Sequence, residues 1–154
     1  MGVRREGREA AIQFLYQRDL GGGAAVSDLQ EFYAFRGLSP SARRFCEGLV
    51  SGLLQHTESI DVALREHTQN YELERLSAVD RNILRLAVHE MLHCDDIPPV
   101  VSINEAIDIA KKYGTEESGR FVNGVLDKIK ATLKRPERTP AGGKQAQGNQ
   151  PTED

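Results

Sequence analysis

Hydrophobic residues recur every three or four positions along most of this chain, and that spacing restricts it to helices. In the first segment Ile12, Leu15, Tyr16 and Leu20 fall at i, i+3, i+4 and i+8, which places them on one face of an amphipathic helix. Comparable stripes run through residues 45–64, 79–91, 103–110 and 122–133. No segment alternates with period two for long enough to form a strand. The spacing therefore predicts an all-α fold.

Capping signals divide this pattern into six or seven helices. Helix starts are predicted at residues 27–30, at Ser39-Pro40, at Ser77, at residues 102–105 and at Thr115. The first helix should end at the glycines 21–23, the helix after Ser77 at residues 95–99, and the next one at Gly114. The start at 27–30 implies a short helix to about Arg36.

Two glycines lie inside the predicted helix that follows Ser39-Pro40. Gly48 and Gly52 each cost a helix about 1 kcal/mol relative to alanine. We therefore expect another helix to approach closely at both positions.

The length of 154 residues fits one domain. We expect a helical domain at residues 1–134 and a disordered polar tail at 135–154, because the tail has no hydrophobic residue larger than alanine. No run approaches the roughly 20 apolar residues that span a bilayer, and the N-terminus does not resemble a secretory signal. With only Cys46 and Cys94, a cytoplasmic protein with reduced thiols is expected.

The distribution of charge points to the ends of the chain. The net charge is −3, which argues against a protein that coats nucleic acid by bulk electrostatics. Residues 1–20 carry four arginines and three acids, a local +1, and residues 134–154 also carry +1, so the middle carries −5. An anionic partner should therefore meet the ends of the chain.

Three arginines, Arg4, Arg5 and Arg8, open the first helix. At about 100° per residue they occupy a sector of roughly 100° at the end of the apolar stripe. Guanidinium groups donate bidentately to phosphate and stack on bases, so this arrangement is typical of an RNA contact. Arg5 and Glu9 form an i, i+4 pair that offsets part of the charge. The alternative is a solvated, frayed terminus.

A second candidate RNA contact lies on the last predicted helix. Arg120, Phe121 and Asn123 supply a charge, a stacking ring and an amide edge, a combination that reads single-stranded RNA. The alternative is that Phe121 belongs to the core and that Gly124 permits tight packing.

His89, Glu90 and His93 match the HExxH pattern of zinc metallopeptidases, in which two histidines bind zinc and the glutamate acts as general base. The third ligand would come from Cys94, Asp95 or Asp96. The extended pattern requires glycine and histidine where this chain has Asp96 and Pro99. Two partly exposed helix histidines are therefore the preferred interpretation, with no metal, no cofactor and no catalysis; a metallopeptidase is the enzyme alternative.

The chain resembles the NusB family of transcription antitermination factors over about residues 4–133. The resemblance is carried by residues 4–16 (RREGREAAIQFLY), 80–85 (DRNILR), 101–111 (VSINEAIDIAK) and 121–128 (FVNGVLDK). In fold it implies a compact bundle of about seven helices in two subbundles. At His89 this chain departs from the family, which commonly has an aromatic residue there.

In function the resemblance implies a factor that binds boxA-type RNA together with NusE, a small-subunit ribosomal protein. Such a factor helps RNA polymerase to resist termination, notably in ribosomal RNA operons. Carried over by position, the RNA-binding residues would be Arg4, Arg5, Arg8, Arg120 and Phe121.

The resemblance also implies candidates for the NusE side, Tyr16 and Asp80. Structural roles account for both residues as well, since Tyr16 lies on the first stripe and Asp80 follows Ser77 by three positions. A further alternative is a helical scaffold that binds only protein, for example a homodimer that hides the arginines.

Overall fold

The computed structural model describes residues 2–21, 29, 32, 37–68 and 72–133. Its helices are α1 (Val3–Leu20), α3 (Pro40–Gln55), α4 (Thr57–His67), α5 (Ala78–His93), α6 (Pro99–Tyr113) and α7 (Glu116–Thr132), with a 3₁₀ turn, η2, at Leu73–Arg75. These residues include no strand, so the all-α prediction is confirmed. Of the helix predicted from residue 27 to about Arg36, Leu29 and Phe32 are described, and both are helical and buried. The rest of that segment up to Arg36 and the tail at 135–154 lie outside the described residues. None of the described helices has the length and apolarity needed to cross a bilayer.

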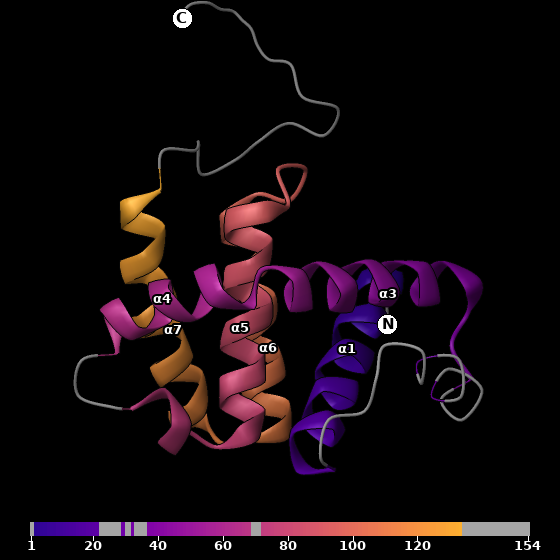
Figure 1. Cartoon of the computed structure of the whole chain (residues 1–154), viewed down its shortest axis with the longest axis horizontal. Coiled ribbons are helices and arrows are strands. Elements are labelled where there is room, and N and C mark those ends of the chain that lie inside the picture. Colours follow the sequence, from indigo (N-terminus) through magenta and orange to yellow (C-terminus); the bar gives the residue numbers. More distant parts are fainter. Residues whose placement is uncertain (1, 22–28, 30–31, 33–36, 69–71, 134–154) are drawn as a thin grey trace, which may run out of the picture.

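Helix α5 is the centre of the bundle (Figure 1). It contacts α1, α3, α4, α6 and α7, and α1 packs mainly on α3 while α6 packs mainly on α7. A helix with neighbours on all sides must be apolar around most of its circumference. The sequence of α5 largely meets this requirement, because six of its nine buried residues are apolar: Ile83, Leu84, Leu86, Ala87, Val88 and Met91.

Three of the predicted helix starts are confirmed by their caps. Ser39 Oγ accepts a hydrogen bond from the backbone N–H of Ala42, Ser77 from that of Asp80, and Thr115 from that of Ser118. Each bond satisfies one of the N–H groups that the first turn of a helix leaves unpaired.

The start predicted at residues 102–105 is wrong. Helix α6 begins three residues earlier, at Pro99, with Pro98 as its N-cap. The fixed φ of proline suits the first helical position, where the missing N–H costs nothing. Ser102 is therefore inside the helix, where it is 2% exposed.

The stripe at residues 45–64 belongs to two helices. Helix α3 ends at Gln55 and α4 begins at Thr57, with His56 between them at φ −112° and ψ 18°. Leu53 and Ile60 both remain buried across this break. The change of direction lets one apolar stripe cover two sides of α5.

The apolar stripe of α1 leaves the core at its C-terminal end. Ile12 and Leu15 are buried, whereas Tyr16 is 36% and Leu20 66% exposed.

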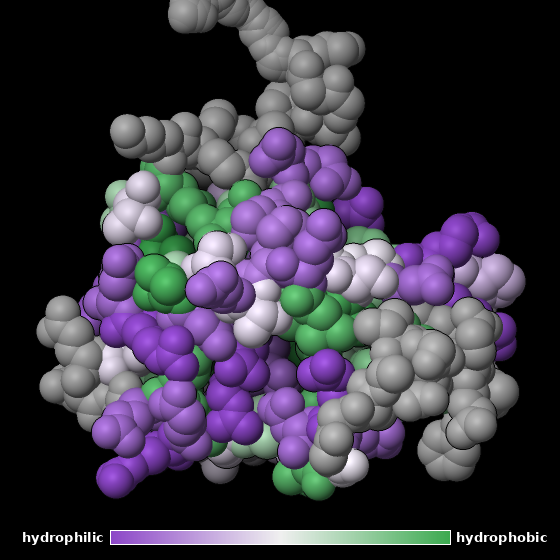
Figure 2. Space-filling view, in the orientation of Figure 1, coloured by the Kyte–Doolittle hydropathy of each residue, from purple (hydrophilic) through white to green (hydrophobic). Residues whose placement is uncertain are grey.

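Figure 2 shows mainly hydrophilic side chains on one face of the molecule, with small hydrophobic patches between them. Scattered patches of this kind are ordinary on a folded protein.

The two glycines of α3 have different surroundings. A Cβ atom on Gly52 would lie 2.7 Å from Cε1 and Nε2 of His89, so the close approach of another helix, α5, is confirmed there. A Cβ atom on Gly48 would meet nothing within 4 Å. The expectation for Gly48 was wrong, because that position faces solvent.

We predict opposite effects of alanine at these two glycines. Gly52→Ala should lower the free energy of unfolding by about 1–3 kcal/mol, because the new methyl group displaces a buried ring. Gly48→Ala should raise it by up to about 1 kcal/mol through helix propensity alone. Urea unfolding followed by circular dichroism measures both, and a Gly52→Ala variant as stable as the parent would contradict the close approach.

Candidate nucleic-acid interface

Arg8 lies beneath the surface in a bidentate ion pair. Its Nε and Nη2 donate to Glu90 Oε2 and Oε1, both at 2.8 Å, and Ser102 Oγ donates to Glu90 Oε1 at 2.7 Å. Arg8 is 4% and Glu90 1% exposed. The interaction joins α1, α5 and α6 at one point. The sequence predicted Arg8 as a surface residue that contacts RNA. In the structure it is buried and holds α1 against α5 and α6. A direct contact between Arg8 and RNA would require the ion pair with Glu90 to open.

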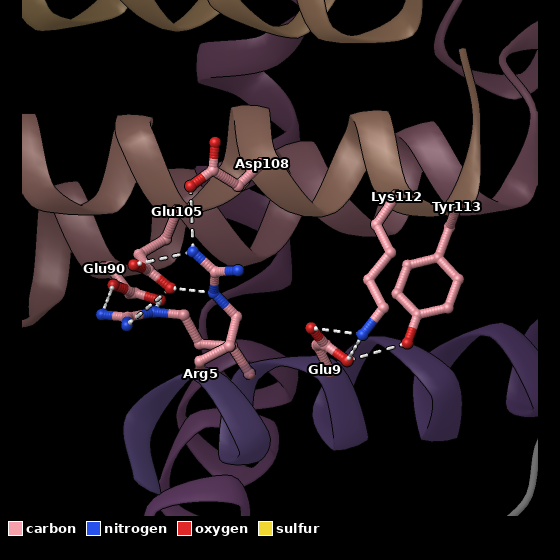
Figure 3. A network of polar contacts seen from close by, with 8 residues as sticks. Arg5, Glu9, Glu90, Glu105, Asp108, Lys112 and Tyr113 are labelled. Carbon is pink, nitrogen blue, oxygen red and sulfur yellow. Dashed lines mark hydrogen bonds and ion pairs between the residues drawn. The ribbon is translucent and has the colours of Figure 1, made fainter. Parts of the chain in front are cut away.

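Arg5 is paired with two carboxylates of α6 (Figure 3). Its Nε donates to Glu105 Oε1 at 2.5 Å, and its Nη2 donates to Glu105 Oε2 at 3.1 Å and Asp108 Oδ2 at 3.0 Å. The side chain of Arg5 is 26% exposed, so one side of the guanidinium group still meets solvent. The hydrogen bonds and charge of Arg5 hold the pKa of Glu105 below its ordinary value.

Glu9 does not form the predicted pair with Arg5. Instead its buried carboxylate accepts hydrogen bonds from Lys112 Nζ at 2.9 Å and Tyr113 Oη at 2.8 Å (Figure 3). This second contact ties the middle of α1 to the end of α6. Since two carboxylates from α6 hold Arg5, and a lysine and a tyrosine from α6 hold Glu9, α1 is fixed to α6 at two successive turns.

Arg4 is the most exposed of the three arginines. Its guanidinium carbon lies 4.9 Å from the centroid of the Phe45 ring, a cation–π distance, and its Nη2 lies 3.6 Å from Asp96 Oδ2. Its side chain is 52% exposed. Arg4 can therefore reach a phosphate group without any rearrangement of the core.

The candidate residues of α7 lie across α6 from Arg5. Arg120 is exposed and Phe121 is partly buried against the core. A Cβ atom on Gly119 would lie 2.8 Å from Lys111 Cγ, so α7 packs closely on α6 at the residue next to Arg120. A Cβ atom on Gly124 would meet nothing within 4 Å, so the alternative that this glycine permits tight packing is wrong.

Arg5 and Arg120 therefore flank one helix. Asp108 of α6 is bonded to Arg5, and Lys111, one turn further along α6, packs against Gly119, the residue next to Arg120. Asn104, Asp108 and Lys111 form the exposed strip of α6 between the two arginines. The structure thus brings both predicted halves of the RNA surface to α6, where the sequence alone indicated no meeting point.

Tyr16 lines a surface pocket of about 170 Å³ on another part of α1. The other lining residues are Ile12, Gln13, Val79 and Tyr113. Asp80 is not a lining residue, but it follows Val79, which is one, in the chain. Burial raises the pKa of Asp80, against hydrogen bonds from Ser77 and Ser118 that lower it. The two residues predicted for a protein partner therefore lie near one largely apolar hollow.

The HExxH residues have other roles. Both carboxylate oxygens of Glu90 accept hydrogen bonds from Arg8, and one also accepts from Ser102, so the carboxylate is not available as a general base. Within the described ranges no group of three or more His, Cys, Asp or Glu side chains is placed to hold a metal ion. The metallopeptidase alternative is therefore rejected.

His89 and His93 belong to a stack of three imidazoles. His56, from the junction of α3 and α4, lies 3.8 Å from His93 between ring centroids and 5.8 Å from His89. His89 is only 4% exposed, so the prediction that both histidines are partly exposed is wrong for it. Burial, then the neighbouring His93 and His56, lower the pKa of His89 to about 4.

Sequence reasoning missed the residues that hold the arginines. Glu90, Glu105 and Asp108 lie far from α1 in the chain, and their spacing carries no sign of their partners. His56 was missed for the same reason. The motif at residues 101–111 contains Glu105 and Asp108, and the HExxH match contains Glu90, but neither pattern indicated that these carboxylates hold arginines.

The fold and the site define an all-helical binding protein whose conspicuous polar residues form structural ion pairs. The sequence profile of the NusB family matches residues 5–131. The chain belongs to the NusB family, which is not a family of enzymes.

Relatives and solved structures agree with this assignment. The chain is 46% identical to transcription antitermination protein NusB of Trichlorobacter lovleyi over 90% of this chain and 98% of the relative, and 48% identical to that of Bacillus cereus over 84% and 98%. It is similar to the crystal structure of T. maritima NusB, with TM-score 0.77 and 38% identity over 84% of this chain and 91% of that one. A structure of antitermination factors NusB and NusE in complex with dsRNA matches with TM-score 0.78 and 31% identity, over 85% and 98%.

We predict that the buried pair depends on both of its members. Arg8→Met should lower the free energy of unfolding by about 3–5 kcal/mol, because it leaves the Glu90 carboxylate buried without its cation. The double variant Arg8→Met/Glu90→Met should recover most of this loss. Arg65→Met, which opens the exposed pair with Glu74, serves as control and should change stability little. A single variant as stable as the parent in urea unfolding would mean that Arg8 is not buried.

The pKa of His89 predicts an acid-sensitive step. In the unfolded chain the imidazole titrates near 6.5, whereas in the folded protein it titrates at about 4. Its contribution to stability is complete above pH 6.5 and is lost as the pH falls to about 4, amounting to at most about 3 kcal/mol. His89→Phe keeps a ring and removes the titration, so its free energy of unfolding should vary less between these pH values. Equal pH dependence in the two proteins would contradict the lowered pKa.

Proposed function

We propose that this chain is a transcription antitermination factor that binds boxA-type RNA jointly with a NusE protein and supports transcription of ribosomal RNA operons. The observation that carries the proposal is the likeness to NusB in the complex of NusB and NusE with dsRNA, over 85% of the chain at 31% identity. The names of the relatives point to the same role. The role places the chain in the cytoplasm, where RNA polymerase works.

The proposed RNA surface lies on both sides of α6. Arg4 and Arg5 contribute cations from α1, and Arg120 and Phe121 contribute a cation and a ring from α7. Phosphate contacts from the arginines give affinity without sequence information, and a ring that stacks on an unpaired base adds selectivity for single strands. Arg8 takes part by holding α1 in place.

The charges explain why a partner is needed. The net charge is −3, and Arg4, Arg5 and Arg8 each have carboxylate neighbours. Such a surface binds RNA weakly alone. A second protein that contacts both the chain and the RNA adds binding free energy and makes the two binding events cooperative. The hollow beside Tyr16 and Asp80 is the proposed place for the protein partner, because it is apolar and lies away from the arginines.

We expect the affinity for boxA RNA to rise at least tenfold when NusE is present, as measured by filter binding or fluorescence anisotropy. Arg120→Ala should weaken binding and reduce the dependence on log[salt] by about 0.7 for one lost phosphate contact to a single strand. Arg65→Ala removes the same charge from α4 and should leave both quantities nearly unchanged.

Equal RNA affinity with and without NusE would remove the joint mechanism and favour the alternative of a protein-only scaffold. Sedimentation of the chain alone tests the related prediction of a homodimer. Loss of RNA binding in such a dimer, with recovery on dilution, would indicate that the arginines are hidden between two copies.

A further inference from the structure

The two carboxylates that hold Arg5 differ in exposure and in the number of bonds they make. Glu105 accepts hydrogen bonds from both Nε and Nη2 of Arg5, and its side chain is 24% exposed. Asp108 accepts one bond, from Nη2, and its side chain is 58% exposed. Both come from α6 and lie one turn apart on it (Figure 3).

We propose that Asp108 is an internal competitor of RNA phosphate for Arg5, whereas Glu105 is the residue that positions Arg5. The inference rests on the proposed function, since it concerns how RNA reaches the same surface. In the free chain the carboxylate of Asp108 occupies the outer N–H group of the guanidinium. On binding, a phosphate oxygen replaces it at Nη2, and Glu105 keeps Nε in place.

The geometry assigns these roles. An exposed ion pair is weak because water and salt screen it, so Asp108 exchanges readily for another anion. Glu105 has two bonds to Arg5 and also lies 3.6 Å from Nη1 of the buried Arg8, which anchors it. The pKa of Glu105 is lowered by the hydrogen bonds and charge of Arg5, as expected of a carboxylate that stays ionised in this position.

Competition between Asp108 and phosphate makes RNA binding depend on additional contacts from a protein partner. A phosphate group that binds Arg5 at Nη2 has to displace Asp108, so the affinity of the free chain for RNA of any sequence is lowered. Phosphate carries no sequence information, so the competition lowers the affinity for boxA RNA and for unrelated RNA by the same factor. A protein partner that adds contacts to the same RNA compensates for this loss of affinity.

The test is RNA binding by Asp108→Asn in the presence of NusE. We expect the affinity for boxA RNA, and for a scrambled RNA of equal length, to rise about threefold to tenfold. Glu74→Gln changes the net charge by the same amount at the exposed pair with Arg65 and should give a clearly smaller rise. Glu105→Gln removes a charge from the same helix but also the anchor of Arg5, so it should not raise the affinity.

A double-mutant cycle with Arg5→Ala isolates the contact. In the Arg5→Ala background, Asp108→Asn should raise the affinity no more than Glu74→Gln does, because the group for which Asp108 competes is gone. Circular dichroism and thermal unfolding of each variant establish that the fold is retained.

The outcomes separate this inference from the proposed function. If the unaltered chain with NusE binds boxA RNA and Asp108→Asn binds no better than Glu74→Gln, the competition is disproved and the proposed function stands. A gain that persists undiminished without Arg5 also disproves it, since it would reflect only the general field of the protein. If Glu105→Gln raises the affinity as much as Asp108→Asn, the distinction between the two carboxylates is wrong. Failure of the unaltered chain to bind boxA RNA with NusE would overturn both proposals.

Discussion

The buried ion pair between Arg8 and Glu90 is the constraint on which the arrangement of the helices depends. Two charges taken out of water lose several kcal/mol of hydration each, and their attraction compensates only when the geometry is good and the remaining lone pairs are satisfied. Here two N–H groups meet two oxygens, and Ser102 supplies a further donor. A small rotation or slip of α1 on α5 would break these bonds. The pair therefore contributes more to the uniqueness of the packing than to stability.

The position of α1 decides how far each arginine is exposed. With Arg8 fixed on α5, Arg5 lies over the carboxylates of α6 and Arg4 lies at the edge of the bundle, over Phe45. Three residues of one type thus have three environments: the side chains of Arg4, Arg5 and Arg8 are 52%, 26% and 4% exposed. The three arginines look equivalent in the sequence, but in the structure their exposure decreases from Arg4, a surface cation, to Arg8, which has a structural role.

Local sequence predicted those features that depend on neighbours in the chain. The caps at Ser39, Ser77 and Thr115 were predictable because a hydroxyl and the N–H group three residues on are brought together by the helix itself. The HExxH match shows the limit of such reasoning. It identified a real pair of neighbouring helical histidines, but the glutamate between them is bonded to Arg8 of α1, and His56, from the junction of α3 and α4, completes an imidazole stack. Those partners are distant in the chain, and only packing brings them together.

By itself the sequence determined the all-helical class, most helix boundaries and, through the motifs at its two ends, membership of the NusB family, because periodicity, capping and signature residues are local properties. The tertiary structure decided which carboxylate meets which arginine, which glycine lies against another helix, and where the two halves of the proposed RNA surface come together. These pairings depend on the depth and rotation at which the five other described helices pack around α5. Burial then sets the strength of each interaction: water screens the exposed pair at Asp108, whereas the buried carboxylate of Glu90 cannot lose its cation without a large loss of stability.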